Sequence, residues 1–171
     1  MELVIRPLET TDAANLLALL AQLQQESTTF MVANDLTHLD SDTQADNISY
    51  LMSTTNNIVL VLADESTQQL LGLITATAIP GHPTIAEVGV AVLAAYQGNG
   101  FAQALIEELL SWALDYSSVT QLILTVQAHN VAAIHIYEKY AFERIADSET
   151  LVKNLADESV AAFDMRLMLE K

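Results

Sequence analysis

Apolar residues along this chain follow two different spacings. Short runs rich in Val, Leu and Ile are typical of buried strands, whereas longer segments repeat their apolar residues every three or four positions, as one face of a helix does. The runs predict strands over residues 2–6, 58–63, 70–79, 84–93, 121–126, 142–146 and 161–169. The longer segments predict helices over residues 13–23, 100–116 and 130–139, with one or two further helical turns at 46–53.

The segments between these elements are polar and hold the residues that favour turns. Residues 64–69 and 80–83 join successive strands as short turns. The acidic stretch 147–158 predicts a long loop. Alternating strands and helices around a mixed sheet indicate an α/β fold, a three-layer α/β/α sandwich. The 171 residues fit one domain with a substantial core, so we expect a single domain over 1–171.

Composition excludes several classes of protein. Hydrophobic residues make up 51% of the chain, too many for disorder, yet no apolar run approaches the ~18–20 residues that span a membrane. The first residues lack the long apolar segment of a signal peptide. Without cysteine there is no disulfide, thiolate nucleophile or cysteine-based metal site. We therefore expect a soluble cytoplasmic protein with no membrane partner.

Charge narrows the choice of partners further. The chain has 22 acidic residues against 6 basic residues, for a formal net charge of −16. Because phosphate contacts to nucleic acids need clustered Lys and Arg, no nucleic-acid partner is expected. The four histidines show no ligand spacing with one another, so no metal is expected either.

The stretch Gln97-Gly98-Asn99-Gly100-Phe101-Ala102 lies between a predicted strand and a predicted helix. The first N–H groups of a helix lack partners within the helix and, with the helix dipole, form an anion site suited to phosphate. A P-loop would need Gly-Lys-Ser/Thr, which is absent, and the dinucleotide fingerprint would need glycine where Gln103 stands. The pattern that remains is Gln-x-x-Gly-x-Ala after a strand rich in valine.

A second segment, residues 130–142, follows another apolar strand and reads Asn-Val-Ala-Ala-Ile-His-Ile-Tyr-Glu-Lys-Tyr-Ala-Phe. Together the two segments resemble the GNAT family of N-acetyltransferases, whose corresponding patterns are Gln/Arg-x-x-Gly-x-Gly/Ala and Asn-x-x-Ala-x-x-x-Tyr-Glu-Lys-x-Gly-Phe. The second segment matches at Asn130, Ala133, Tyr137, Glu138, Lys139 and Phe142. It departs at Ala141, where the family usually has glycine, so Ala141 must either take an ordinary negative φ or accept some strain.

The resemblance implies the acyl-CoA N-acyltransferase fold, with a mixed and mostly antiparallel sheet. It also implies transfer of an acetyl group from acetyl-CoA, as cosubstrate, to a primary amine by direct attack in a ternary complex. The acceptor would be a small-molecule amine or a peptide amine, and a homodimer is possible. Two alternatives stay open, a non-catalytic acyl-CoA-binding regulatory domain and acetylation of a protein N-terminus.

Two residues are candidates for the chemistry that the resemblance implies. In this family a tyrosine at the position of Tyr137 lies near the coenzyme sulfur, so Tyr137 is the candidate general acid; otherwise it is an aromatic anchor under the short helix. Glu87 is the candidate base, acting directly or through water; otherwise it is a solvent-exposed residue at the start of its strand. Strand alternation places Glu87, Gly89, Ala91 and Leu93 on one face of the sheet, and Val88, Val90 and Val92 on the other.

The remaining candidates would bind the cofactor. Residues 90–92 would pair with the pantetheine arm by strand addition, which requires a local splay in the sheet. Asn130 would contact the cofactor, cap the short helix, or do both in part. The full expected set is Val90, Ala91, Val92, Gln97, Gly98, Asn99, Gly100, Phe101, Ala102, Asn130, Ala133 and Tyr137.

Charge bears on both substrates. No basic residue lies in the 97–102 loop, so pyrophosphate binding would rest mainly on backbone N–H groups, and added salt should strengthen it by screening the net repulsion. The acidity itself reflects either solubility or attraction of a cationic acceptor. A group of N-terminal carboxylates either holds such an amine or belongs to a solvated loop. Its members are Glu26, Asp35, Asp40, Asp42 and Asp46.

Overall fold

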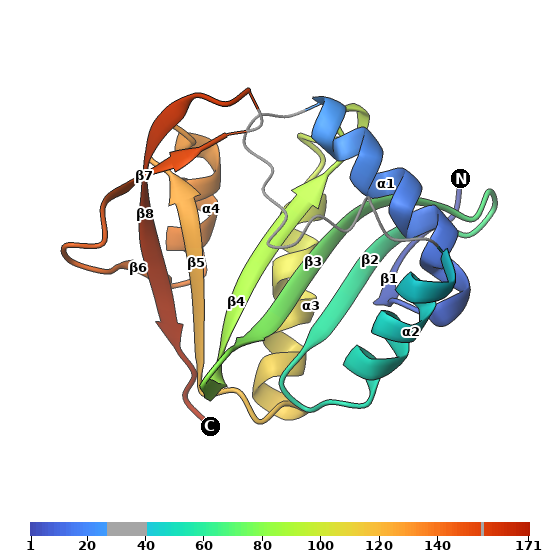
Figure 1. The fold of residues 1–171 in the computed structure, drawn as a ribbon, viewed down its shortest axis with the longest axis horizontal. Coiled ribbons are helices and arrows are strands. Elements are labelled where there is room, and N and C mark those ends of the chain that lie inside the picture. Colours follow the sequence, from blue (N-terminus) through green and yellow to red (C-terminus); the bar gives the residue numbers. More distant parts are fainter. Residues whose placement is uncertain (27–40, 155) are drawn as a thin grey trace.

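The computed structural model describes residues 1–26, 41–154 and 156–171. Within these residues, strands form one sheet in the order β1-β2-β3-β4-β5-β8-β6, with β7 also paired to β8 (Figure 1). The strands are β1 (Leu3–Pro7), β2 (Ile58–Asp64), β3 (Gln69–Ile79), β4 (His82–Val92), β5 (Gln121–Gln127), β6 (Glu143–Arg144), β7 (Thr150–Lys153) and β8 (Ser159–Met168). The helices are α1 (Ala13–Glu26), α2 (Ser41–Met52), α3 (Phe101–Asp115) and α4 (Val131–Lys139), with short 3₁₀ turns η1 (Thr10–Asp12) and η3 (Ala94–Tyr96).

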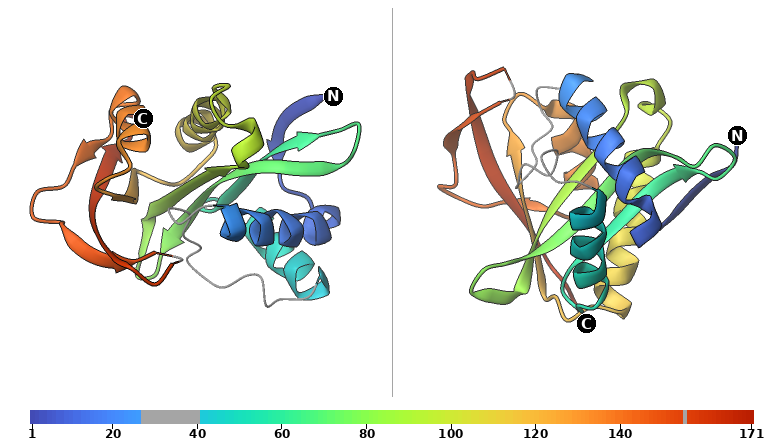
Figure 2. Two further views of the ribbon diagram at one scale, coloured as in Figure 1. Left: turned by 90° about the horizontal axis from the view of Figure 1, so that it is seen from above. Right: turned by 45° about the vertical axis from the view of Figure 1, so that its right-hand side comes forward.

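Helices cover both faces of the sheet. Figure 2 shows α1 and α2 on one face and α3 and α4 on the other, which confirms the predicted three-layer α/β/α sandwich. Only the β4–β5 pairing is parallel among the described strand pairs, so the sheet is mixed and mostly antiparallel as expected.

Each helix buries one apolar stripe against the sheet. In α3, Leu105, Ile106 and Leu109 recur at helical spacing and are buried in one cluster with the β4 side chains Ala86 and Val88. The opposite face of the sheet packs against α1 in a second cluster. The alternation predicted for β4 is confirmed, because Val92 belongs to the first cluster, whereas Leu93 and the partly buried Ala91 belong to the second.

The sheet splits between β4 and β5. Their parallel pairing covers only Ile85–Gln121, Ala86–Leu122 and Glu87–Ile123. Beyond Glu87, β4 continues to Val92 while pairing with β3 alone among the described strands, and β5 continues beside β8. The two strands diverge toward the end of the molecule that holds η3 (Figure 1). The splay that the cofactor hypothesis required is therefore present.

Two sequence predictions need correction. The region 147–158 is not one loop, because residues 150–153 form β7, an antiparallel hairpin partner of β8. Asn154 closes the turn between β7 and β8, because its Oδ1 accepts the N–H groups of Ala156 and Glu158. The acidic residues around Asn154 made this turn difficult to recognise in the sequence. The helical turns expected at 46–53 belong to a longer helix, which begins at Ser41. Among the described residues, none of the helices combines the length and the apolar character that spanning a membrane requires.

Candidate functional site

The loop between β4 and α3 has the conformation that its glycines permit. Gly98 and Gly100 have φ values of 79° and 81°, in the left-handed region that favours glycine. Gly100 is the N-cap of α3, and a Cβ added at either glycine would meet nothing within 4 Å. The glycines are thus required by backbone conformation, and the space beside them is open to a ligand.

Side chains of the loop hold it in place. Gln97 Nε2 donates to the carbonyl of Val92 at 2.9 Å, and Asn99 Nδ2 donates to the carbonyls of Tyr96 and Gln97 at 3.3 and 3.2 Å. Across the described residues, the backbone N–H groups of residues 98–102 have no hydrogen-bond acceptor. These side chains therefore brace the loop and leave its N–H groups, together with the positive end of α3, available for an anion.

The unpaired edge of β4 leads directly into this loop. Val90 and Val92 pair with β3 on one side, at Ile74 and Gly72, and face the split on the other. Backbone groups at such an edge can pair with an amide-rich ligand chain. Gly72 opposite Val92 leaves no room for a larger residue, since an added Cβ would lie 3.0 Å from the carbonyl oxygen of Ala91.

Tyr137 lies on α4 against the core cluster that also contacts Val90 and Phe101. The Tyr137 ring packs against the Phe142 ring, with 5.9 Å between the ring centroids and an angle of 56° between the ring planes. Its hydroxyl has no hydrogen-bond partner among the described residues, and burial raises the pKa of Tyr137 to about 12. A phenol with this pKa stays protonated at physiological pH, so it can donate a proton but cannot serve as a base.

Asn130 and its neighbours show that the second motif is also structural. Asn130 Oδ1 accepts the N–H of Ala133 at 3.3 Å, so Asn130 is the N-cap of α4. Its Nδ2 has no partner among the described residues and stays available for a second role. Ala133 is half-buried against the core. Ala141 takes φ = 71°, so it accepts the strain that glycine would avoid.

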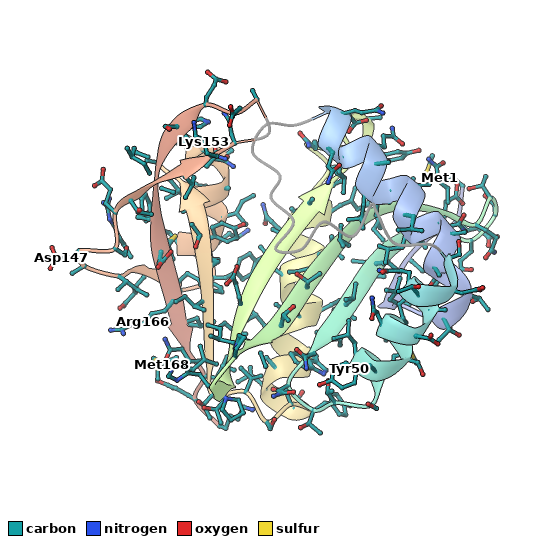
Figure 3. All side chains as sticks on the ribbon, in the orientation of Figure 1. Met1, Tyr50, Asp147, Lys153, Arg166 and Met168 are labelled. Carbon is teal, nitrogen blue, oxygen red and sulfur yellow. The ribbon has the colours of Figure 1, made fainter. Side chains whose placement is uncertain are left out.

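Glu87 lies at the last β4–β5 pair, where the sheet begins to split. Its side chain is exposed on the face covered elsewhere by α1 and α2, and it makes no hydrogen bond or ion pair with the described residues. Ile123 pairs with Glu87 on one side and with Arg166 on the other, so Glu87 and Arg166 lie in one row across the sheet. Figure 3 shows the Arg166 side chain extending outward from β8. Glu87 is thus an unpaired carboxylate at the apex of the split.

The structure describes three of the five N-terminal carboxylates, and one of them, Glu26, already has a backbone partner. Glu26 Oε2 accepts the backbone N–H of Ala94 at 2.8 Å, which links the end of α1 to η3. Asp42 and Asp46 are exposed on α2, and Asp35 and Asp40 lie outside the described residues. The described residues include no group of three or more His, Asp or Glu side chains that could hold a metal ion.

Sequence reasoning missed a contact between a cation of α4 and the first turn of α3. Lys139, at the end of α4, donates from Nζ to Gln103 Oε1 at 2.7 Å, and Gln103 lies in the first turn of α3. The motif match singled out Lys139 without a role for it. The two residues are 36 positions apart, and no local pattern indicates that they meet.

Known proteins are similar to this chain in sequence and in fold. The model of the acetyltransferase (GNAT) family matches residues 19–142. An L-amino acid N-acetyltransferase of Escherichia coli is 28% identical over 144 residues, which cover 83% of each chain. A GNAT-family acetyltransferase from Streptococcus pneumoniae superimposes with a TM-score of 0.86 at 26% identity, covering 98% of this chain and 100% of that one. An acetyltransferase from Salmonella typhimurium, solved with its cofactor acetyl-CoA, superimposes with a TM-score of 0.79 at 19% identity, covering 100% and 96%.

Proposed function

Since this chain belongs to the acetyltransferase (GNAT) family and is an acetyl-CoA-dependent N-acetyltransferase, we propose that it acetylates a small primary amine by direct attack in a ternary complex. The observation that carries this proposal is the β4–β5 split, which opens beside a glycine loop with unpaired N–H groups. Such a site combines an edge for an amide-rich arm with an anion site at a helix N-terminus.

The residues present fit this cosubstrate. The N–H groups of residues 98–102 would bind its pyrophosphate, and the unpaired edge of β4 at 90–92 would bind its pantetheine amides. Phe101 and Ala133, half-buried against the same core cluster, would line the apolar side. Asn130 would use its Nδ2, because its Oδ1 already caps α4. The cosubstrate supplies the activated acetyl thioester.

Two side chains would move the protons. Glu87, directly or through water, would accept a proton from the acceptor amine, whose nitrogen forms the new bond to the acetyl carbon. As the carbon–sulfur bond breaks, the Tyr137 hydroxyl would donate its proton to the leaving sulfur. The pKa of about 12 keeps that hydroxyl protonated until the step occurs. No residue needs to be acetylated, which accords with the absence of cysteine.

The acceptor class rests on two observations. Similarity to an L-amino acid N-acetyltransferase supports an amino acid α-amine. The net charge of −16 supports an acceptor that carries positive charge, because the field of the protein would attract it. An amino acid and a positively charged amine both belong to the class of small primary amines. A peptide amino terminus is the larger alternative.

The test is thiol release from acetyl-CoA against a panel of L-amino acids, polyamines, aminoglycosides and short peptides. Release that depends on one amine class would support the enzyme and identify its acceptor. Tight binding of coenzyme A with no release from any member of the panel would contradict a small-amine acceptor. It would favour the non-catalytic binding domain instead.

A further inference from the structure

We propose that Lys139 binds a phosphate group of the coenzyme and so replaces the basic residue that the glycine loop lacks. This inference rests on the proposed function, because it assumes that the loop binds the coenzyme. Lys139 Nζ lies 2.7 Å from Gln103 Oε1, in the first turn of the helix whose N-terminus faces the loop. A residue 36 positions away thus brings a positive charge to the anion site.

Lys139 is one of three described Lys and Arg residues without a carboxylate partner, and Arg166 and Lys171 are the other two. Among the described cations, Arg6, Arg144 and Lys153 form ion pairs with carboxylates, whereas Lys139 is held by a neutral amide and forms none. Acidic residues outnumber basic ones by 22 to 6, so carboxylate partners are plentiful. The ammonium beside α3 therefore has no carboxylate of the described residues within ion-pair distance and is accessible to an external anion.

The position is also electrostatically unfavourable without a ligand. A helix N-terminus carries partial positive charge, so a cation beside it is repelled. Lys139 is the last residue of α4, where a cation is favoured, but this does not explain why its ammonium reaches α3. Its Nζ also lies 5.7 Å from the ring centroid of Tyr140, whose hydroxyl donates to Glu107 Oε1 on α3 at 2.7 Å. These contacts fix α4 to α3 and hold the ammonium in place, and a bound phosphate would offset the repulsion.

The same helix offers a matched control. Lys171 Nζ donates to the carbonyl of Ser117 at 2.8 Å, just beyond the C-terminal end of α3. Lys139→Met and Lys171→Met therefore remove the same charge from opposite ends of one helix. We expect Lys139→Met to weaken coenzyme A binding about tenfold, the size of a lost charge-assisted contact, and Lys171→Met to change it less than twofold.

The experiment measures dissociation constants by calorimetry for coenzyme A and dephospho-coenzyme A, and by NMR titration for pantetheine. A loss confined to coenzyme A would assign Lys139 to the 3′-phosphate, and a loss shared with dephospho-coenzyme A but not with pantetheine would assign it to the pyrophosphate. An equal loss for all three ligands, or no difference between the two variants, would overturn the proposal. If the unmodified protein bound no coenzyme A at all, the proposed function itself would fail.

A second variant separates binding from stability. Gln103→Glu places a carboxylate in the first turn of α3, where it favours the helix dipole, and pairs it with Lys139. Under the proposal, this variant melts at the same or a higher temperature yet binds coenzyme A several-fold more weakly. Because the new carboxylate would also repel a phosphate directly, Gln103→Glu is repeated in the Lys139→Met background. An equal loss of affinity in both backgrounds would mean that Lys139 has no part in binding the phosphate.

Discussion

Glu26 Oε2 accepts a hydrogen bond of 2.8 Å from the backbone N–H of Ala94, although the two residues are 68 positions apart. Glu26 ends α1, and Ala94 begins η3, the turn that precedes the glycine loop. The helix layer on one face of the sheet is therefore tied to the backbone that positions the proposed phosphate site on the other. Glu26 is committed to this contact, which argues against its having a free role in holding a cationic acceptor.

We predict that Glu26→Leu raises the KM for acetyl-CoA several-fold, because η3 loses its link to α1 and the loop is less well positioned. Glu26→Gln should retain most of the affinity, since an amide oxygen also accepts from an N–H. Steady-state kinetics with varied acetyl-CoA would measure both. If Glu26→Leu and Glu26→Gln raised the KM for acetyl-CoA equally, the negative charge of Glu26 would matter and its hydrogen bond would not.

Tyr137→Phe should lower kcat on the order of 10²-fold and leave coenzyme A affinity unchanged. The ring would still pack against Phe142, so only the proton donor is removed. Tyr140→Phe is the matched control, because that hydroxyl bonds Glu107 on α3 and has no proposed part in the chemistry. Comparable loss of kcat in both variants would indicate that the position of α4, not the Tyr137 proton, limits the reaction.

Glu87→Gln should lower kcat/KM on the order of 10²-fold near neutral pH. The loss should shrink as the pH approaches the pKa of the acceptor amine, because an already neutral amine needs no base. A pH profile of kcat/KM for both proteins measures this. A loss that stays constant across the profile would show that Glu87 acts by binding the acceptor. Glu108→Gln, on the exposed side of α3, controls for a simple change in net charge.

Ala141→Gly should stabilise the protein by about 0.5–1 kcal/mol. At φ = 71° the alanine carries the strain of the left-handed region, which exceeds the extra chain entropy of glycine in the unfolded state. Ala21→Gly, at an exposed position in the interior of α1, should destabilise by a similar amount. Urea denaturation measures the free energy of unfolding, which should rise in Ala141→Gly and fall in the helix variant. A lower free energy of unfolding for Ala141→Gly would contradict the assigned conformation.

Asp12→Asn should destabilise the protein by about 2 kcal/mol at neutral pH, because Asp12 accepts from Arg6 at 2.7 and 3.0 Å and from the N–H of Glu9 at 2.8 Å. Burial alone would raise the pKa of Asp12, but the hydrogen bonds from Arg6 and Glu9 and the charge of Arg6 outweigh it and lower the pKa.

The sign of the pH dependence follows from that lowered pKa. The contribution is fully present above the pKa of an unfolded aspartate, about 3.9, and is lost as the pH falls through the lower folded value. The difference in melting temperature between the two proteins should therefore persist from neutral pH to about pH 4 and shrink below it. A difference that already vanished near pH 6 would contradict the Arg6–Asp12 pairing.

The elements that were predicted well are those encoded by contiguous residues. The helix stripe at Leu105, Ile106 and Leu109 and the alternation along β4 depend on the spacing of apolar residues alone. The glycine loop likewise follows from a local need for positive φ at Gly98 and Gly100. The short strand β7 escaped prediction because four residues carry too little periodicity, and its stability comes from pairing with β8.

By itself, the sequence determined the strand and helix pattern that gives the layers of the fold and the place of the glycine loop, because both depend on residues adjacent in the chain. It offered Asn130 as a cap of α4 without deciding between that role and a cofactor contact. Only the tertiary structure decided that β4 and β5 separate beyond Glu87, that Glu26 reaches Ala94, and that Lys139 reaches Gln103. These contacts join residues far apart in the sequence, so their geometry depends on how the helices dock on a twisted sheet. Local preferences carry no information about that docking, which is why the contact between α4 and the first turn of α3 could not be predicted.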